Sequence, residues 1–133
     1  MKYLLDTNVC IALIRQKPKE IIKQLTSHRP GDIGISTITI AELIHGAQKS
    51  KQAEQNMTAL DQFLLPLEIA DFDQRAAIAY GHIRAYLETK GTLIGSMDML
   101  IAAHALGLGV ALVTSNTRPF KRIPDLKIED WMT

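Results

Sequence analysis

The sequence has a single cysteine, few aromatic residues and almost no net charge. Cys10 cannot form a disulfide within the chain, which is typical of proteins in a reducing compartment, and we expect it to be a small buried hydrophobe. Aromatic residues make up 5% of the 133 residues, which argues against recognition of nucleic acid by many stacked rings. The net charge is +1, so any attraction for a polyanion must come from local clusters of cations.

The sequence also lacks an apolar run long enough to cross a membrane. Its most apolar stretch, residues 99–113, is interrupted by His104, Gly107 and Gly109, and it is shorter than the ~20 residues that a membrane helix requires. The N-terminal segment has the pattern of a strand, so we expect no secretory leader. The hydrophobic content of 47% fits a globular protein. We therefore expect one domain, residues 1–133, that works in the cytoplasm without a membrane partner.

Short apolar runs alternate with amphipathic stretches along the chain. Strands are predicted at residues 3–5, 32–36, 67–70 and 110–114, with a short last strand within residues 124–131. Helices are predicted at residues 7–16, 18–25, 37–47, 53–65 and 73–90, and a last one opens at Ser96 or Asp98 and closes at Gly107 or Gly109. The β-branched run TITI at 37–40 is ambiguous between helix and strand. The expected fold class is α/β, a three-layer α/β/α sandwich with a mainly parallel central sheet.

Polar residues follow the predicted strands, where ligands bind in parallel sheets. Asp6 ends the first strand, and Asn116 comes two residues after residues 110–114. Asp98 lies at the start of the helix that leads into that strand. Glu42 lies about a turn into the helix after residues 32–36, from which a long side chain can reach back over the sheet edge. All four side chains can therefore share one rim of the sheet.

Three carboxylates and an amide that converge at ~4–6 Å would raise each other's pKa by repulsion. A hard divalent cation relieves that repulsion, and Mg²⁺ prefers oxygen ligands of this kind. Such a cation can activate water against a phosphodiester without a protein nucleophile. The chain shows no convincing Ser-His-Asp or Cys-His arrangement and no glycine-rich phosphate loop. Taken singly, however, Asp6 and Asp98 are equally compatible with helix caps, Glu42 with a solvated face and Asn116 with a turn.

Four blocks of the sequence resemble those of the PIN-domain ribonucleases, and among them the VapC-like toxins of type II toxin–antitoxin pairs. In chain order they are LLDTN, ISTITIAELIHGA, GSMDMLIAAHA and LVTSNTRPFKRI. They occur in the family's order and spacing, and the resemblance runs from Tyr3 to Trp131. It implies a small PIN-like α/β/α sandwich, in agreement with the pattern of strands and helices.

The resemblance also implies a set of site residues. The positions that match the family's catalytic and metal-binding residues are Asp6, Glu42, Asp98 and Asn116. The positions that match supporting residues are Thr7, Asn8 and Thr114. The family has Asp or Asn at the fourth position, so the asparagine here leaves three formal negative charges. Whether one or two cations act is therefore left open.

The activity implied by the resemblance is endonucleolytic cleavage of RNA with Mg²⁺ or Mn²⁺, by attack of water in line with the leaving oxygen. The products would carry 5′-phosphate and 3′-hydroxyl ends. Some similar family members cut the anticodon stem-loop of initiator tRNA and so inhibit translation. Arg118, Lys121 and Arg122 follow Asn116 and either hold RNA phosphates there or form a solvated basic loop.

The expected partners are a cognate VapB-like antitoxin, an RNA substrate and a second copy of the chain. The predicted helices at 7–16 and 18–25 carry more apolar surface than one core obviously needs, although core burial alone could account for it. We expect a homodimer and a toxin–antitoxin hetero-oligomer. The family likeness further implies that the antitoxin reaches the acidic pocket with a basic side chain.

Two other functions fit parts of the pattern. A small phosphatase would use Asp6 as a covalent nucleophile, but such enzymes usually have a second aspartate where this chain has Asn8. A non-catalytic PIN-like interaction domain would not need all three acidic positions. Away from these positions, His104 is expected to be a core histidine with its hydrogen bonds satisfied, and Trp131 is expected to anchor the C-terminal tail.

Overall fold

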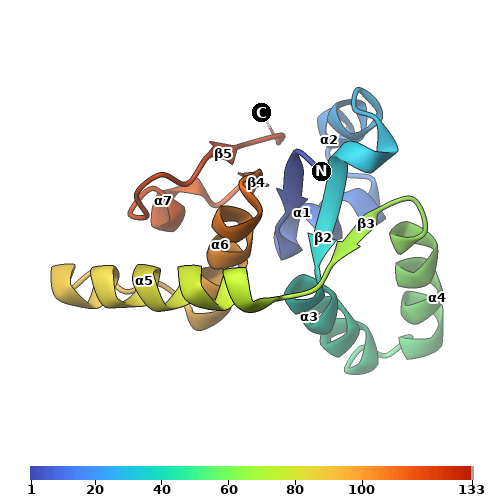
Figure 1. Cartoon of the computed structure of the whole chain (residues 1–133). Coiled ribbons are helices and arrows are strands. Elements are labelled where there is room, and N and C mark those ends of the chain that lie inside the picture. The colour runs from blue at the N-terminus through green and yellow to red at the C-terminus, as the bar shows by residue number, and fades with distance from the viewer. Residues whose placement is uncertain (133) are drawn as a thin grey trace.

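A computed structural model describes residues 1–132, whose strands form one parallel sheet (Figure 1). The sheet has five strands in the order β3-β2-β1-β4-β5. In chain order they are β1 (Tyr3–Leu5), β2 (Ile33–Ser36), β3 (Glu68–Ala70), β4 (Ala111–Val113) and β5 (Ile128–Glu129). Leu5 on the central strand lies in register with Ile35 on one side and Val113 on the other. The carboxyl ends of β1, β2 and β4 therefore meet at one edge.

Helices connect successive strands of the sheet. They are α1 (Thr7–Arg15), α2 (Lys19–Thr26), α3 (Thr37–Gln48), α4 (Ala53–Leu64), α5 (Gln74–Lys90), α6 (Ser96–Leu108) and α7 (Thr117–Phe120), with a 3₁₀ turn at Pro30–Asp32. The predicted α/β class and the parallel central sheet are confirmed. None of these helices, within the described residues, has both the length and the apolar character needed to span a membrane.

The alternation of side chains along the strands divides the core into two layers. Leu4 and its neighbour Leu112 pack against α5, α6 and α7, whereas Leu5 and Val113 pack against α1 to α4. Adjacent residues of a strand point to opposite faces of the sheet, so each face buries its own cluster. These two clusters, one on each face, make the three-layer sandwich that the sequence predicts.

The helix boundaries differ from the prediction in a few places. The TITI run forms the first turn of α3, because the Ser36 hydroxyl accepts the Ile38 N–H at 3.0 Å and caps the helix there. The cap of α6 is Gly95, and Asp98 lies inside its first turn, so the interpretation of Asp98 as a cap is wrong. The sequence analysis did not predict α7, because a four-residue helix is too short to show an apolar period.

The C-terminal tail is held by an aromatic cluster. Trp131 is buried, with its ring stacked on His28 at 5.2 Å between centroids and edge-on to Tyr3 at 5.4 Å. Its indole N–H donates to a Glu129 carboxylate oxygen at 3.1 Å. The predicted anchoring role of Trp131 is confirmed, and Cys10 is buried as predicted.

Candidate active site

Asp6 is the most buried acid of the candidate site, with 5% of its surface exposed. It directly follows β1 and is the N-cap of α1, where its carboxylate accepts the Val9 N–H at 2.8 Å. Its own N–H donates to the Val113 carbonyl at the end of β4, at 3.0 Å. These bonds hold the carboxylate at the carboxyl edge of the sheet, next to the end of β4.

Glu42 reaches back toward this edge from the second turn of α3. One oxygen of its half-buried carboxylate accepts the Thr7 hydroxyl at 2.6 Å, a contact between residues 35 positions apart. Thr7 is the first residue of α1, so this bond ties the start of α1 to α3. Glu42 therefore lies beside Asp6, as expected, and Thr7 positions it.

Neighbouring charges affect the ionisation of Asp6 and Asp98. Burial is the main cause that raises the pKa of Asp6, and the charges of Asp98 and Glu42 raise it further. The Thr114 hydroxyl and the Val9 N–H oppose this rise by stabilising the charged form. The pKa of Asp98 is also raised, first by burial and then by the charge of Glu42. The three acids thus form one electrostatically coupled group at the sheet edge.

Asn116, the fourth candidate residue, is exposed, unlike the three acids. Thr114 is fully buried after β4, and its hydroxyl accepts the Asn116 backbone N–H at 3.1 Å. This bond puts the backbone of Asn116 at the same edge, but its exposed side chain makes no cap bond on α7. Asn8 is likewise exposed, in the first turn of α1. The structure therefore joins Thr114 to the acids and leaves the side chains of Asn116 and Asn8 facing solvent.

The donor set fits a hard divalent cation with several retained waters. Within residues 1–132, no three Asp, Glu, His or Cys side chains close into a ready-made metal cage. Mg²⁺ does not need one, because it is commonly held by one or two carboxylates and completes its shell with water and substrate phosphate. Three coupled carboxylates whose charges oppose one another offer such ligands.

Basic residues follow the site on α7 and just beyond it. Arg118, Lys121 and Arg122 are all exposed. The Arg122 guanidinium donates to the Leu93 carbonyl at 3.4 Å, which links this segment to the loop before α6 and hence to Asp98. The cations therefore stand on segments that flank the acids, where a polyanion could be held.

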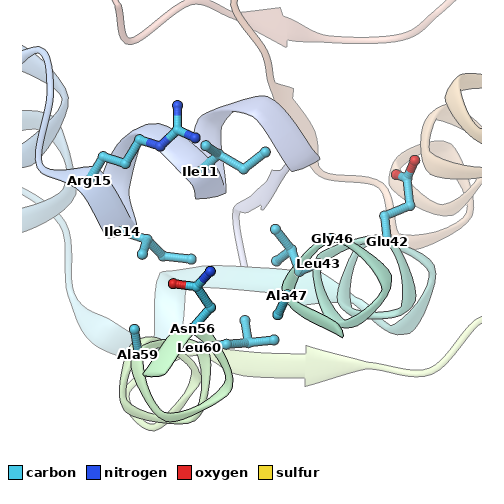
Figure 2. A pocket seen from close by; sticks show the side chains of 10 residues that line it. All are labelled: Ile11, Ile14, Arg15, Glu42, Leu43, Gly46, Ala47, Asn56, Ala59 and Leu60. Atoms are coloured by element: carbon cyan, nitrogen blue, oxygen red, sulfur yellow. The ribbon is translucent and has the colours of Figure 1, made fainter. Parts of the chain in front are cut away.

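A groove of about 270 Å³ lies between α1, α3 and α4 (Figure 2). Figure 2 shows Glu42 at one end, with its carboxylate directed away from the apolar side chains of Ile14 and Leu60. The lining residues are Ile11, Ile14, Arg15, Glu42, Leu43, Gly46, Ala47, Asn56, Ala59 and Leu60. The half-buried Ile11 and Ile14 are part of the apolar surface noted in the sequence. The sequence analysis did not predict the contribution of α4, because the packing of one helix beside another is not visible in its own apolar period.

Comparison with known proteins shows extensive similarity. Residues 3–126 match the family model described as PIN domain. The chain is 46% identical over 131 residues to the tRNA(fMet)-specific endonuclease VapC of Salmonella typhimurium, with 98% of each chain covered. It is 46% identical over 132 residues to Ribonuclease VapC2 of Rickettsia felis, again with 98% of each covered.

Solved structures give the same result for the fold. VapBC2 from Rickettsia felis, bound to a DNA fragment from its promoter, is similar with a TM-score of 0.93 and 45% identity, over 98% of this chain and 99% of that one. DNA-bound VapBC from Salmonella typhimurium is similar with a TM-score of 0.94 and 45% identity, over 98% of both chains. Sequence and fold are therefore shared along nearly the whole length.

Proposed function

The chain belongs to the PIN-domain family, among the VapC ribonucleases, and from this membership we propose that it is a metal-dependent endoribonuclease and the toxin of a toxin–antitoxin pair. The observation that carries the proposal is the placement of the Asp6 and Glu42 carboxylates at one edge of the sheet, joined through Thr7, with Asp98 near enough to raise the pKa of Asp6. A structural cap or a solvated acid would not need two further carboxylates beside it.

Asp6, Glu42 and Asp98 would hold Mg²⁺ or Mn²⁺, directly or through water, with Asn116 as a further oxygen ligand after rotation of its side chain. When bound, the cation would supply Lewis acidity and activation of water. Thr7 and Thr114 orient Glu42 and Asp6 through hydroxyl groups, which limits the reorganisation needed for binding. Asn8 would support the same site from the start of α1.

The proposed reaction is hydrolysis of an RNA phosphodiester. The oxygen of water bonds to phosphorus while the bond from phosphorus to the 3′ oxygen breaks. One water proton ends on that 3′ oxygen, and the other ends on the new phosphate or in solvent. The carboxylates orient the attacking water, and Arg118, Lys121 and Arg122 hold neighbouring phosphates in register. The products carry 5′-phosphate and 3′-hydroxyl ends.

We propose tRNA as the substrate class, with the anticodon stem-loop of initiator tRNA as the first candidate. The support is the 46% identity to a relative from Salmonella typhimurium that is named a tRNA(fMet)-specific endonuclease. Cleavage of an initiator tRNA would inhibit translation, which is a toxic outcome for the cell. Work in the cytoplasm, where tRNA is found, follows from the same proposal.

The two alternative functions are less well supported. A phosphatase with Asp6 as nucleophile would form an aspartyl-phosphate, but such enzymes usually have a second aspartate where this chain has Asn8. A non-catalytic domain would not require two further acids whose charges raise the pKa of the buried Asp6 at a cost in stability.

The activity is tested with purified initiator and elongator tRNA in Mg²⁺, beside Asp6→Asn and Asp98→Asn variants. Each variant is expected to cut about a hundredfold or more slowly, since loss of a ligand removes several kcal/mol of transition-state stabilisation. Asp61→Asn, an exposed acid on α4, is the matched control and should cut normally. Cutting that survives EDTA or either site variant would contradict the proposal, and equal cutting of both tRNAs would contradict the substrate.

We further propose that a VapB-like antitoxin segment docks in the groove between α1, α3 and α4. The similar structures from Rickettsia felis and Salmonella typhimurium are of VapBC. The groove is lined mainly by apolar side chains and ends at the Glu42 carboxylate, so it suits an apolar segment that ends in a basic side chain. A docked segment would thereby block the acids. A homodimer of the chain within that complex remains part of the proposal.

A further inference from the structure

A buried hydrogen bond between two polar side chains joins α3 and α6, away from the carboxylates that these helices carry. His104 on α6 and Ser36 at the end of β2 are both fully buried, and the His104 Nδ1 lies 2.7 Å from the Ser36 Oγ. The helix α6 carries Asp98, and the helix capped by Ser36 carries Glu42. His104 follows Asp98, and Ser36 precedes Glu42, by six positions each.

The Ser36 hydroxyl connects two groups. It accepts the Ile38 N–H, and it still has a proton and a second lone pair with which to bond the His104 Nδ1. A neutral imidazole can keep this contact in either tautomer. Burial lowers the pKa of His104, and the nearby Asp71 and Asp73 only partly oppose that effect. The neutral form is therefore the one present near pH 7.

The other ring nitrogen of His104, Nε2, adds little to the stability of the fold. It makes no hydrogen bond of good geometry within residues 1–132, so the expectation of a fully satisfied core histidine is wrong, although the Asp71 backbone is close enough to raise the pKa of His104. The ring lies edge-on to Phe72, with 5.4 Å between centroids. A buried ring nitrogen without a well-formed hydrogen bond is unfavourable. The short hydrogen bond of this histidine is the one at Nδ1, which a leucine could not make.

We propose that His104 is a positioning residue, whose bond to Ser36 sets the spacing of α3 and α6 and thereby the spacing of Glu42 and Asp98. The inference rests on the proposed metal-dependent function. The Thr7–Glu42 bond fixes α3 to α1, and the Ser36–His104 bond fixes the same helix to α6. With both bonds present, the two acids meet at a separation set by the protein before a cation arrives.

The test compares His104→Leu with His104→Asn, whose side-chain amide can replace Nδ1 as the partner of Ser36. Ile101→Val is the matched control, because Ile101 is a buried residue of α6 in the apolar core. Mn²⁺ binding is measured on each protein by electron paramagnetic resonance, and kcat and KM are measured for tRNA cleavage. The leucine variant should bind Mn²⁺ about three- to tenfold more weakly, as expected for loss of one hydrogen bond, with KM unchanged. The asparagine variant should recover most of the affinity, and Ile101→Val should retain it.

Ser36→Ala breaks the same bond from the other side at nearly constant volume, although it also removes the Ile38 cap bond of α3. It carries the test if His104→Leu fails to fold, and the double variant with His104→Leu separates the two effects. The effect of Ser36→Ala on Mn²⁺ affinity should not add to that of the leucine variant. Lower thermal stability with native Mn²⁺ affinity in these variants would overturn the inference and leave His104 a structural residue. Failure of the native protein to bind Mn²⁺ would instead overturn the proposed function, and the inference with it.

Discussion

The observed role of Asp6 as a helix cap and its proposed role as a metal ligand can be separated by substitution. As a helix cap it needs only an oxygen that accepts the Val9 N–H, whereas as a metal ligand it needs a negative charge. Asparagine keeps the first property and loses the second, and it is a good N-cap residue. Asp6→Asn therefore isolates the effect of the charge on stability as well as on activity.

We expect Asp6→Asn to stabilise the metal-free protein near neutral pH. The pKa of Asp6 is raised in the folded state, so the unfolded chain loses this proton first as pH rises, and the charge then destabilises the native state. The native protein should accordingly become relatively more stable as pH falls toward the ordinary aspartate pKa. Thermal unfolding in EDTA at pH 7.5 should show a Tm about 2–5 °C higher for the variant, as for a change of ~1 kcal/mol.

Lower pH and added Mg²⁺ should both reduce the stability difference between Asp6→Asn and the native protein. The advantage of Asp6→Asn should shrink at pH 4.5, and Mg²⁺ should raise the Tm of the native protein more than that of the variant. Asp61→Asn, at an exposed position, should change neither quantity. A variant that is less stable than the native protein at pH 7.5 in EDTA would show that the carboxylate is not under electrostatic strain.

At the scale of the elements, the position of Asp98 depends on how α6 packs against its neighbours. A Cβ added at Gly107 would lie 3.1 Å from the Ala76 nitrogen and 3.2 Å from the Arg75 carbonyl carbon, both backbone atoms of α5. Backbone cannot move aside as a flexible side chain can, so Gly107 allows the close approach of the two helices. This contact determines how closely α6 packs against α5, at the end of α6 opposite to Asp98.

Gly107→Ala is expected to destabilise the protein by about 1–3 kcal/mol, the usual range for overpacking. The matched control is Gly81→Ala on α5, where a Cβ would meet nothing within 4 Å. That change should stabilise the protein by roughly 0.5–1 kcal/mol, since alanine loses less backbone entropy in a helix. Urea unfolding of both variants gives the comparison, and equal changes in the two would refute the close-packing argument.

At the scale of the whole molecule, Glu42 belongs both to the acids at the carboxyl edge of the sheet and to the groove between α1, α3 and α4. A partner seated in the groove would therefore contact a ligand of the proposed metal site. The elements that form the groove come from three separate parts of the chain, so its shape depends on the assembled fold. Inhibition by an antitoxin and cleavage of RNA would in this way compete for one residue.

Ala59→Arg should weaken antitoxin binding without affecting RNA cleavage. Ala59 is exposed on α4 and lines the groove, so a large charged side chain would obstruct docking and leave the core intact. A loss of about 1–3 kcal/mol, or roughly ten- to hundredfold in Kd, is expected for a clash within an interface. Calorimetry with the cognate antitoxin measures it. Thr58→Arg, on the adjacent exposed position outside the groove lining, should bind normally, and equal loss in both variants would contradict docking there.

Local patterns were sufficient to predict most of the elements, whereas the four polar positions were only candidates until the family resemblance grouped them. The Asp6 cap, the Asp73 cap and the Gly91 end of α5 depend on neighbours within a few residues, and the structure has them as predicted. The helix α7 was missed because it is too short to show a period. The sequence could not indicate that the Asn116 side chain faces solvent, since that depends on how the chain turns after Thr114.

The sequence by itself determined the α/β class and the parallel sheet, because apolar periodicity is a property of neighbouring residues, and it offered the acids as candidates that the family resemblance grouped into one site. Only the tertiary structure decided the Thr7–Glu42 bond, the Ser36–His104 bond and the shape of the groove. These features join residues 35 and 68 positions apart, or helices from separate segments. Such contacts depend on how whole helices pack on the sheet, and no local pattern of residues specifies that packing.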